Sequence, residues 1–216
     1  MSGTKTFPGK LVSLEGGEGA GKSTAMQFLA DRIAARGVEM VRVREPGGTP
    51  AGEAIRAVLL DPQFKGLDAN AELLLMFAAR AQLVSQVIKP ALERGAVVLA
   101  DRFTDASFAY QGGGRGIDEA FIAELERRVV GIKPDLSLLL DVPVEAGLAR
   151  VRGRGGEQDR IETEASSFFE RVRGAYRERA AREPQRWRII DASQTVEGVQ
   201  AQLGRALDGF FGEANA

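Results

Sequence analysis

Five short runs of apolar residues alternate along the chain with longer segments whose apolar residues recur at helical spacing. These runs are 11–14, 38–43, 96–100, 136–140 and 187–190. Most of them are apolar on both faces, which is typical of strands buried between two layers of helices. Because strands joined by crossover helices pair in parallel, this order predicts an α/β domain in three layers, with a five-stranded parallel sheet flanked by helices.

The segments between these runs predict the helices, at 22–36, 49–60, 70–89, 118–130, 143–152, 163–182 and 195–211. Gly37 suits a left-handed helix stop, Thr49 followed by Pro50 suits a helix start, and Pro90 should kink or end the third helix. Two glycine-rich stretches, 111–116 and 152–160, are predicted to be loops over a site. Neither a repeat nor a linker interrupts the chain, so residues 1–216 are expected to form one domain.

The composition excludes several kinds of chemistry. Hydrophobic residues make up 44% and charged residues 27%, with a formal net charge of -1, so nothing favours nucleic acid or an anionic membrane. Cysteine and histidine are both missing, which removes thiolate nucleophiles, imidazole bases and the usual zinc ligands. Without an apolar run as long as a membrane span, or an apolar segment at the start, we expect a cytoplasmic protein.

A glycine-rich stretch lies between the first apolar run and the first helix. It fits the phosphate-loop pattern Gly16-x-x-x-x-Gly21-Lys22-Ser23. Glycines allow backbone N–H groups to turn inward around a phosphate, and the start of the helix adds partial positive charge. Lys22 would contact the β- and γ-phosphates of ATP, and Ser23 would face Mg²⁺. The predicted ATP phosphate site is Gly16, Gly17, Glu18, Gly19, Ala20, Gly21, Lys22, Ser23 and Thr24.

Two further patterns favour a small kinase over a GTPase, whose Asn-Lys-x-Asp motif is missing. Asp101 follows the run 96–100 and could hold Mg²⁺ through water, while Arg102 could clamp a second phosphate. A simple ion pair is the alternative. Phe77 and Arg80 lie on one helix face, where an aromatic plane beside a fork of donors suits a flat heterocycle with a carbonyl. The alternative is a core Phe and a surface Arg.

Arginines and glycines are interleaved in a segment predicted to be a lid, at about 150–162. These arginines are Arg150, Arg152, Arg154 and Arg160. Mobile arginines could close over a polyphosphate and neutralise the charge that develops during transfer. A solvated basic loop or a nucleic-acid arm is the alternative, although the neighbouring acidic residues argue against an arm.

Taken together, the motifs resemble those of the bacterial thymidylate kinases. The residues that carry the resemblance are EGGEGAGKST, REPGGT (44–49), FAAR (77–80), DR (101–102), AYQGGGRGI (109–117), PDLSLLLDV (134–142) and DRIE (159–162), in that order. The likeness covers about residues 10–205. It implies the phosphate-loop fold of the nucleoside-monophosphate kinases and transfer of the γ-phosphoryl group of ATP to dTMP with Mg²⁺. It also implies a homodimer, which would explain why helix 70–89 is apolar nearly all round.

By position, the resemblance implies a dTMP site made of Glu18, Phe77, Arg80, Arg102, Ser107 and Gln111. Phe77 would stack on thymine, Arg80 would bond its carbonyl edge, and Arg102 would hold the phosphate. Glu18 would face the deoxyribose 3′-hydroxyl or nearby waters. Relatives without a basic residue at the position of Gly19 carry arginines in the lid, so Arg152 and Arg154 are expected to stabilise the transition state.

The acceptor in this reaction is a phosphate oxygen that is already largely ionised near neutral pH, so a strong general base is not required. The expected catalytic residues are Lys22, Arg102, Arg152 and Arg154, and the expected Mg²⁺ ligands are Ser23 and Asp101. Two other functions stay open. One is another nucleoside-monophosphate or deoxynucleoside kinase on the same fold, and the other is a non-catalytic nucleotide-dependent switch.

Overall fold

A five-stranded sheet forms the centre of the computed structural model, which describes residues 8–155 and 159–213. All strand pairs are parallel, in the order β2-β3-β1-β4-β5. The strands are β1 (Lys10–Gly16), β2 (Met40–Arg44), β3 (Val97–Asp101), β4 (Leu136–Asp141) and β5 (Trp187–Asp191). The five predicted strands are confirmed, with ends shifted by at most two residues.

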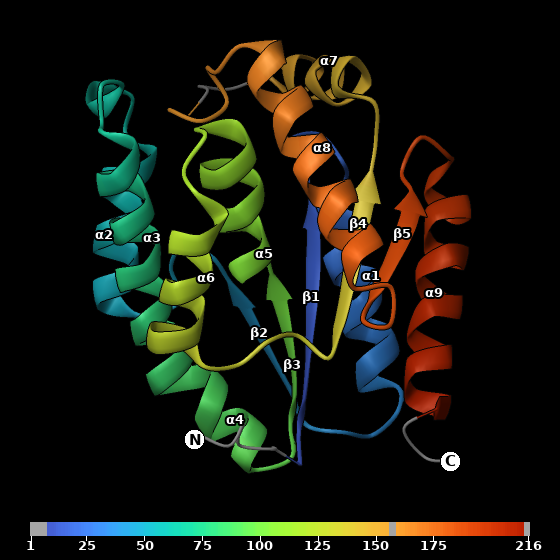
Figure 1. The fold of residues 1–216 in the computed structure, drawn as a ribbon. Coiled ribbons are helices and arrows are strands. Elements are labelled where there is room, and N and C mark those ends of the chain that lie inside the picture. Colours follow the sequence, from blue (N-terminus) through green and yellow to red (C-terminus); the bar gives the residue numbers. More distant parts are fainter. Residues whose placement is uncertain (1–7, 156–158, 214–216) are drawn as a thin grey trace.

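Helices cover both faces of the sheet, which confirms the three-layer α/β fold (Figure 1). On one face, Leu14 of β1 packs with Leu29 and Leu203 from the first and last helices. On the other face, Val98 of β3 packs with Leu73 from a long helix. The helices are α1 (Lys22–Ala34), α2 (Pro50–Leu60), α3 (Ala69–Leu83), α4 (Lys89–Glu93), α5 (Thr104–Ser107), α6 (Glu119–Leu125), α7 (Val144–Arg154), α8 (Ser166–Arg182) and α9 (Val196–Glu213).

Local capping signals act as the sequence indicates. The hydroxyl of Thr49 accepts a hydrogen bond from the backbone N–H of Gly52 at 3.0 Å, and Pro50 occupies the first position of α2. Gly37 adopts a left-handed conformation with φ of 72°, three residues after the end of α1. These caps satisfy backbone groups that the ends of a helix leave unpaired.

Pro90, predicted to kink or end the third helix, does not end it. A π-helical segment, Val84–Ile88, follows α3, and α4 then continues the helical backbone to Glu93. The wider turn shifts the hydrogen-bonding pattern, so Pro90 lies at the start of a new α-helical run. Its missing N–H is tolerated there, because the first N–H groups of a helix have no intrahelical acceptor.

The prediction of a loop at 111–116 is also wrong for most of its length. A π-helical segment spans Phe108–Gly114 and packs against α8. A Cβ added at Gly113 would lie 2.6 Å from the side chain of Ala175, and one at Gly114 would lie 2.4 Å from the ring of Phe168. The glycines of this stretch therefore allow two helical segments to approach closely, rather than making a loop flexible.

One stretch, Ala69–Glu93, is long and apolar enough to cross a membrane by length and composition alone, contrary to the expectation that no such run exists. In the fold it contributes to the core, because Leu73, Leu83 and Ile88 are buried against the sheet. Arg80 in its middle forms a fully buried ion pair with Glu45. We therefore assign this stretch to the core of the domain.

The carboxyl ends of three neighbouring strands meet at one edge of the sheet. In the register of the sheet, Asp101 of β3 lies beside Leu14 of β1 on one side and beside Arg44 of β2 on the other. Ligands of open parallel sheets bind at this edge. The fold thus brings the phosphate loop, the Asp101–Arg102 pair and the segment after β2 to one place.

Candidate active site

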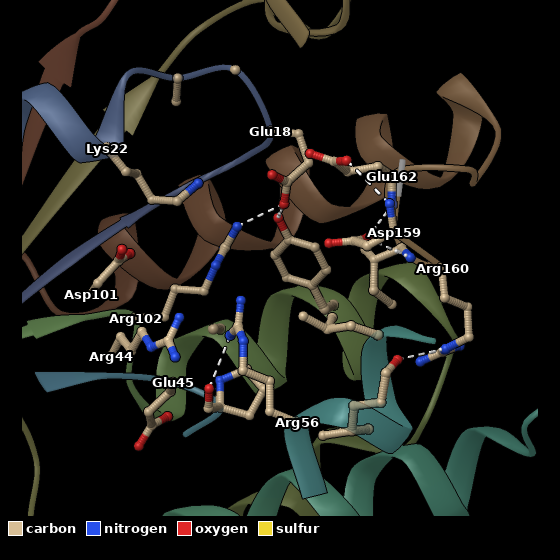
Figure 2. A pocket seen from close by; sticks show the side chains of 18 of the residues that line it. Glu18, Lys22, Arg44, Glu45, Arg56, Asp101, Arg102, Asp159, Arg160 and Glu162 are labelled. Atoms are coloured by element: carbon tan, nitrogen blue, oxygen red, sulfur yellow. Dashed lines mark hydrogen bonds and ion pairs between the residues drawn. The ribbon is translucent and has the colours of Figure 1, made fainter. Parts of the chain in front are cut away.

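A cleft with a volume of about 690 Å³ lies at this edge of the sheet. Figure 2 shows Lys22, Asp101 and Arg102 at one end, Arg160 at the other, and Glu18 between them. We call the end around Lys22, Asp101 and Arg102 the loop end. The opposite end, lined by Glu72, Gln111 and Arg160, is called the far end.

The phosphate loop has a backbone path that requires glycine. Gly19 and Gly21 have φ of 69° and 90°, in the left-handed region that residues with a Cβ rarely adopt. A Cβ at Gly19 would also lie 2.0 Å from the backbone oxygen of Gly147 in α7. The loop therefore contacts α7 backbone to backbone, and this contact explains why position 19 carries no basic side chain here.

Lys22 points back into the loop. Its ammonium donates hydrogen bonds to the carbonyl oxygens of Gly17 at 2.8 Å and Gly16 at 3.2 Å. Burial, and then the charge of Arg102, lowers the pKa of Lys22 to about 8, although Glu18 acts against this. An anion in the loop would raise this pKa toward the ordinary value. The other predicted loop residues, Glu18, Gly19, Ala20, Gly21, Ser23 and Thr24, line the cleft.

Arg102 follows β3 with φ of 68°, an unusual conformation for a residue with a side chain. Its guanidinium donates to Glu18 at 2.7 Å and to the carbonyl of Gly16 at 2.9 Å, and it lies 4.7 Å from the ring centre of Tyr110. Local strain of this kind persists where the surroundings enforce it, and it is concentrated at functional sites. The turn carries the cation of Arg102 from the sheet edge to the phosphate loop, where it forms an ion pair with Glu18.

Asp101 and Ser23, the predicted metal ligands, both line the cleft. Within the described ranges, one carboxylate oxygen of Asp101 is buried and has no hydrogen-bond partner. The same ranges hold no cluster of three or more acidic side chains that could bind a metal unaided. A hard cation at this place would need further oxygen ligands from a bound phosphate or water.

Phe77, Arg80 and Ser107 lie together behind Glu45, a residue that lines the cleft. The guanidinium of Arg80 lies 4.6 Å from the ring centre of Phe77 and donates to Glu45 at 2.7 Å and to Ser107 at 3.1 Å. All four side chains are buried, so Arg80 is not a surface arginine. In this structure Phe77, Arg80 and Ser107 do not line the cleft, whereas Glu45 and Gln111 do.

The predicted lid arginines differ in their placement. Arg150 of α7 donates to the carbonyl oxygens of Gly19 at 3.3 Å and Ala192 at 3.1 Å, and Arg152 is exposed. The side chain of Arg154 and residues 156–158 lie outside the described part. Arg160 is only 2% exposed, in contrast to the predicted mobile cation. It is held in place because its guanidinium donates to Glu72 at 2.6 Å.

Several residues of the cleft were not identified from the sequence. Tyr110 donates to Glu18 at 2.8 Å, and Arg56 of α2 donates to the carbonyl of Pro46 at 2.9 Å. Arg44 also lines the cleft, and Glu72 anchors the far end. Arg44 and Tyr110 lie inside motifs that carry the family resemblance, so the motifs held a signal for them. Arg56 and Glu72 stand in ordinary helical sequence without such a signal.

Several known thymidylate kinases are similar to this chain over most of its length. Residues 14–203 match the family described as thymidylate kinase. The thymidylate kinase of Chromohalobacter salexigens is 58% identical over 93% of this chain and 95% of its own length. That of Ectopseudomonas mendocina is 55% identical over 92% and 95%. A crystal structure of thymidylate kinase from Ehrlichia chaffeensis matches 93% of this chain and 98% of its own, with 31% identity and a TM-score of 0.75. The chain therefore belongs to the thymidylate kinase family.

Proposed function

We propose that this chain transfers the γ-phosphoryl group of ATP to dTMP, giving ADP and dTDP. The family supports this activity, and so does one observation on the site. Within a single cleft, Lys22 lies inside a phosphate loop and Arg102 faces the same loop from the sheet edge. Two cations placed in this way can hold a donor and an acceptor phosphate end to end, which is the alignment that phosphoryl transfer needs.

The loop end would work by positioning and electrostatics. Backbone N–H groups of the loop and Lys22 would hold the β- and γ-phosphates of ATP, and Arg102 would hold the phosphate of dTMP. Burial acts to lower the pKa of Arg102, but its neighbours, Glu18 among them, raise the pKa well above the ordinary value, so the guanidinium stays charged. Arg56 lines the same cleft and can assist on the acceptor phosphate. Such fixed charges stabilise a transferring group without covalent chemistry, which suits a chain lacking histidine and cysteine.

The residues at the loop end fit a Mg²⁺ ion that accompanies ATP. One oxygen of the Asp101 carboxylate is buried and has no hydrogen-bond partner among the described residues. Ser23 lines the same cleft. We propose that this oxygen and the Ser23 hydroxyl hold the ion, directly or through water, with phosphate oxygens completing its shell. The ion would supply positive charge to the phosphates, while Lys22 and Arg102 orient them.

The end of α7 would supply the remaining charge. Because Gly19 leaves no room for a basic side chain in the loop, we propose that Arg152 and Arg154 act on the transferring group, with Arg150 fixing α7 against the loop. Arg160 would instead anchor the base of this segment. Closure of the predicted lid, at about 150–162, over the nucleotides would also exclude water from the reaction.

For the nucleoside of dTMP we propose the residues that the family resemblance indicates. Phe77 would stack on thymine and Arg80 would contact its carbonyl edge, with Ser107 and Gln111 beside them and Glu18 near the 3′-hydroxyl. The support is the family resemblance alone, since in this structure Arg80 lies over the Phe77 ring and neither residue lines the cleft. Replacing Phe77 with Ala should weaken dTMP binding about tenfold or more, in line with the value of base stacking. Unchanged dTMP binding by calorimetry would rule out the stacking role.

We further infer that the protein is cytoplasmic and binds neither nucleic acid nor a membrane. We also infer a homodimer that forms through helix 70–89, with α2 beside it. Leu74 of α3 and Val58 of α2 are 50% and 36% exposed, an apolar surface that a second copy would cover. Light scattering should give the mass of a dimer for the wild type. Leu74→Glu should shift it toward the monomer, and a monomeric wild type would contradict the proposal.

A coupled assay of ADP release tests the proposed reaction. ADP release should require dTMP, and a panel of nucleoside monophosphates and deoxynucleosides should give slower turnover. Faster turnover with another monophosphate or with an unphosphorylated nucleoside would indicate another kinase of the same fold. Slow hydrolysis that ignores dTMP would instead indicate a nucleotide-dependent switch.

A further inference from the structure

One buried carboxylate organises the far end of the cleft. Glu72 lies in the first turn of α3 and is 1% exposed. Its oxygens accept hydrogen bonds from Gln111 at 2.8 Å, from Arg115 at 3.1 Å and from Arg160 at 2.6 Å. Figure 2 shows Arg160 at this end of the cleft, on the segment that follows α7. A single side chain thus joins the cleft wall to the base of the predicted lid.

The carboxylate of Glu72 stays ionised although it is buried. Burial acts to raise its pKa, but the hydrogen bonds from Gln111, Arg115 and Arg160 outweigh burial and lower the pKa below the ordinary value. An ionised carboxylate can only accept hydrogen bonds. Gln111 must therefore turn its NH₂ group toward Glu72, which directs its carbonyl oxygen the other way.

The carbonyl oxygen of Gln111 is left with an open acceptor position. The side chain is 3% exposed and lines the cleft. Its Oε1 atom is buried and accepts no hydrogen bond from any residue that the structure describes. Leaving a buried carbonyl unpaired is unfavourable. A ligand that presents an N–H group to this oxygen would therefore bind more tightly than one that presents a lone pair.

We propose that Glu72 is a positioning residue that selects the base of the acceptor nucleotide by fixing the orientation of the Gln111 amide. The fixed carbonyl accepts the ring N–H of thymine or uracil. It repels cytosine, whose ring nitrogen at the same position is itself an acceptor. This inference rests on the proposed function, since it concerns the acceptor of that reaction. Because Arg160 shares the carboxylate, base selection and the anchoring of the 159–162 segment depend on the same group.

Calorimetric binding of dTMP, dUMP and dCMP to three variants tests the orientation. In the wild type, dCMP should bind about 100-fold more weakly than dTMP, and dUMP should bind more like dTMP. Glu72→Gln supplies an amide that can donate to the Gln111 carbonyl, so the Gln111 amide can turn over. The ratio of dTMP affinity to dCMP affinity should then narrow about tenfold or more. Glu72→Asp keeps an acceptor-only group and should keep the ratio, even where affinity falls.

Glu164→Gln is the matched control. Glu164 is the other carboxylate that Arg115 contacts, at 2.6 Å, and the contacts of Gln111 do not include it. The same chemical change there should leave the ratio unaltered. An unchanged ratio in Glu72→Gln, or an equal narrowing in Glu164→Gln, would overturn the inference while the wild type still phosphorylates dTMP. A wild type that makes no dTDP would instead refute the proposed function.

If Glu72→Gln does not fold, as judged by circular dichroism, the wild type still tests the contact between the Gln111 carbonyl and the base, on which the inference depends. A dTMP analogue methylated on the ring nitrogen lacks the N–H donor. Its binding should be weaker than that of dTMP by about tenfold or more. Equal binding of the analogue and dTMP would show that the Gln111 carbonyl does not accept from the base.

Discussion

The two ends of the cleft hold their ligand groups by different means. At the loop end, Asp101 and Arg102 face one continuous stretch, Gly16 to Thr24, which shapes the site largely with backbone groups. The fit of this stretch depends on the absence of side chains at Gly19 and Gly147. At the far end, the side chains of Glu72, Gln111 and Arg160 come from three segments far apart in sequence and meet through buried, charge-assisted contacts. The loop end should therefore be sensitive to added atoms, whereas the far end should be sensitive to changed charge.

The largest effect is expected from removing the one positively charged side chain inside the loop. Lys22→Ala should lower kcat by about 1,000-fold or more, because no backbone group can replace a charge on the transferring phosphate. Steady-state ADP release measures this loss. Lys10→Ala is the control, since Lys10 forms a partly exposed ion pair with Asp135. A near-normal kcat in Lys22→Ala would mean that the loop end works by backbone contacts alone.

The contrast between the two ends also explains what could be predicted from the sequence. The phosphate loop follows from local rules, because the glycine pattern, the preceding strand and the following helix are neighbours in the chain. The far end depends on Glu72 meeting Arg160 across 88 residues, and helical periodicity says nothing of such a contact. The same limit applies to 111–114, where tight packing against α8 rather than loop formation requires the glycines.

The lid arginines sharpen the comparison because they lie beside the loop without belonging to it. Arg152→Ala and Arg154→Ala should each lower kcat, the more important of the two by about 100-fold, with little change in dTMP affinity. The reason is that a charge recruited by closure acts on the transition state rather than on the bound acceptor. Arg128→Ala is the control, because it removes only an exposed ion pair with Glu124, four residues earlier in the chain and outside the cleft. A loss confined to dTMP affinity would remove these arginines from catalysis.

Two glycines of the phosphate loop, Gly17 and Gly19, test whether the stability of the loop end is sensitive to a single added carbon atom. Gly19→Ala should destabilise the fold by about 1–3 kcal/mol, since a Cβ would be forced into a left-handed position and against Gly147. Gly17→Ala should shift the unfolding free energy little, because a Cβ there meets nothing within 4 Å. Denaturant unfolding of both variants measures the difference. Equal shifts would show that the loop adjusts and that backbone contact with α7 does not define it.

The smallest expected effect concerns the protons of the loop end. With a pKa of about 8, Lys22 is partly neutral in the free protein at pH 8, and ATP phosphates should raise its pKa toward the ordinary value. Binding should then take up about half a proton at pH 8 and almost none at pH 6.5, and ATP affinity should fall as the pH rises through 8. Calorimetry in buffers of different ionisation enthalpy measures this uptake. In Lys22→Arg the charge does not titrate, so the uptake at pH 8 should disappear. Uptake that persists in this variant would assign the proton to another group and leave the ammonium of Lys22 charged throughout.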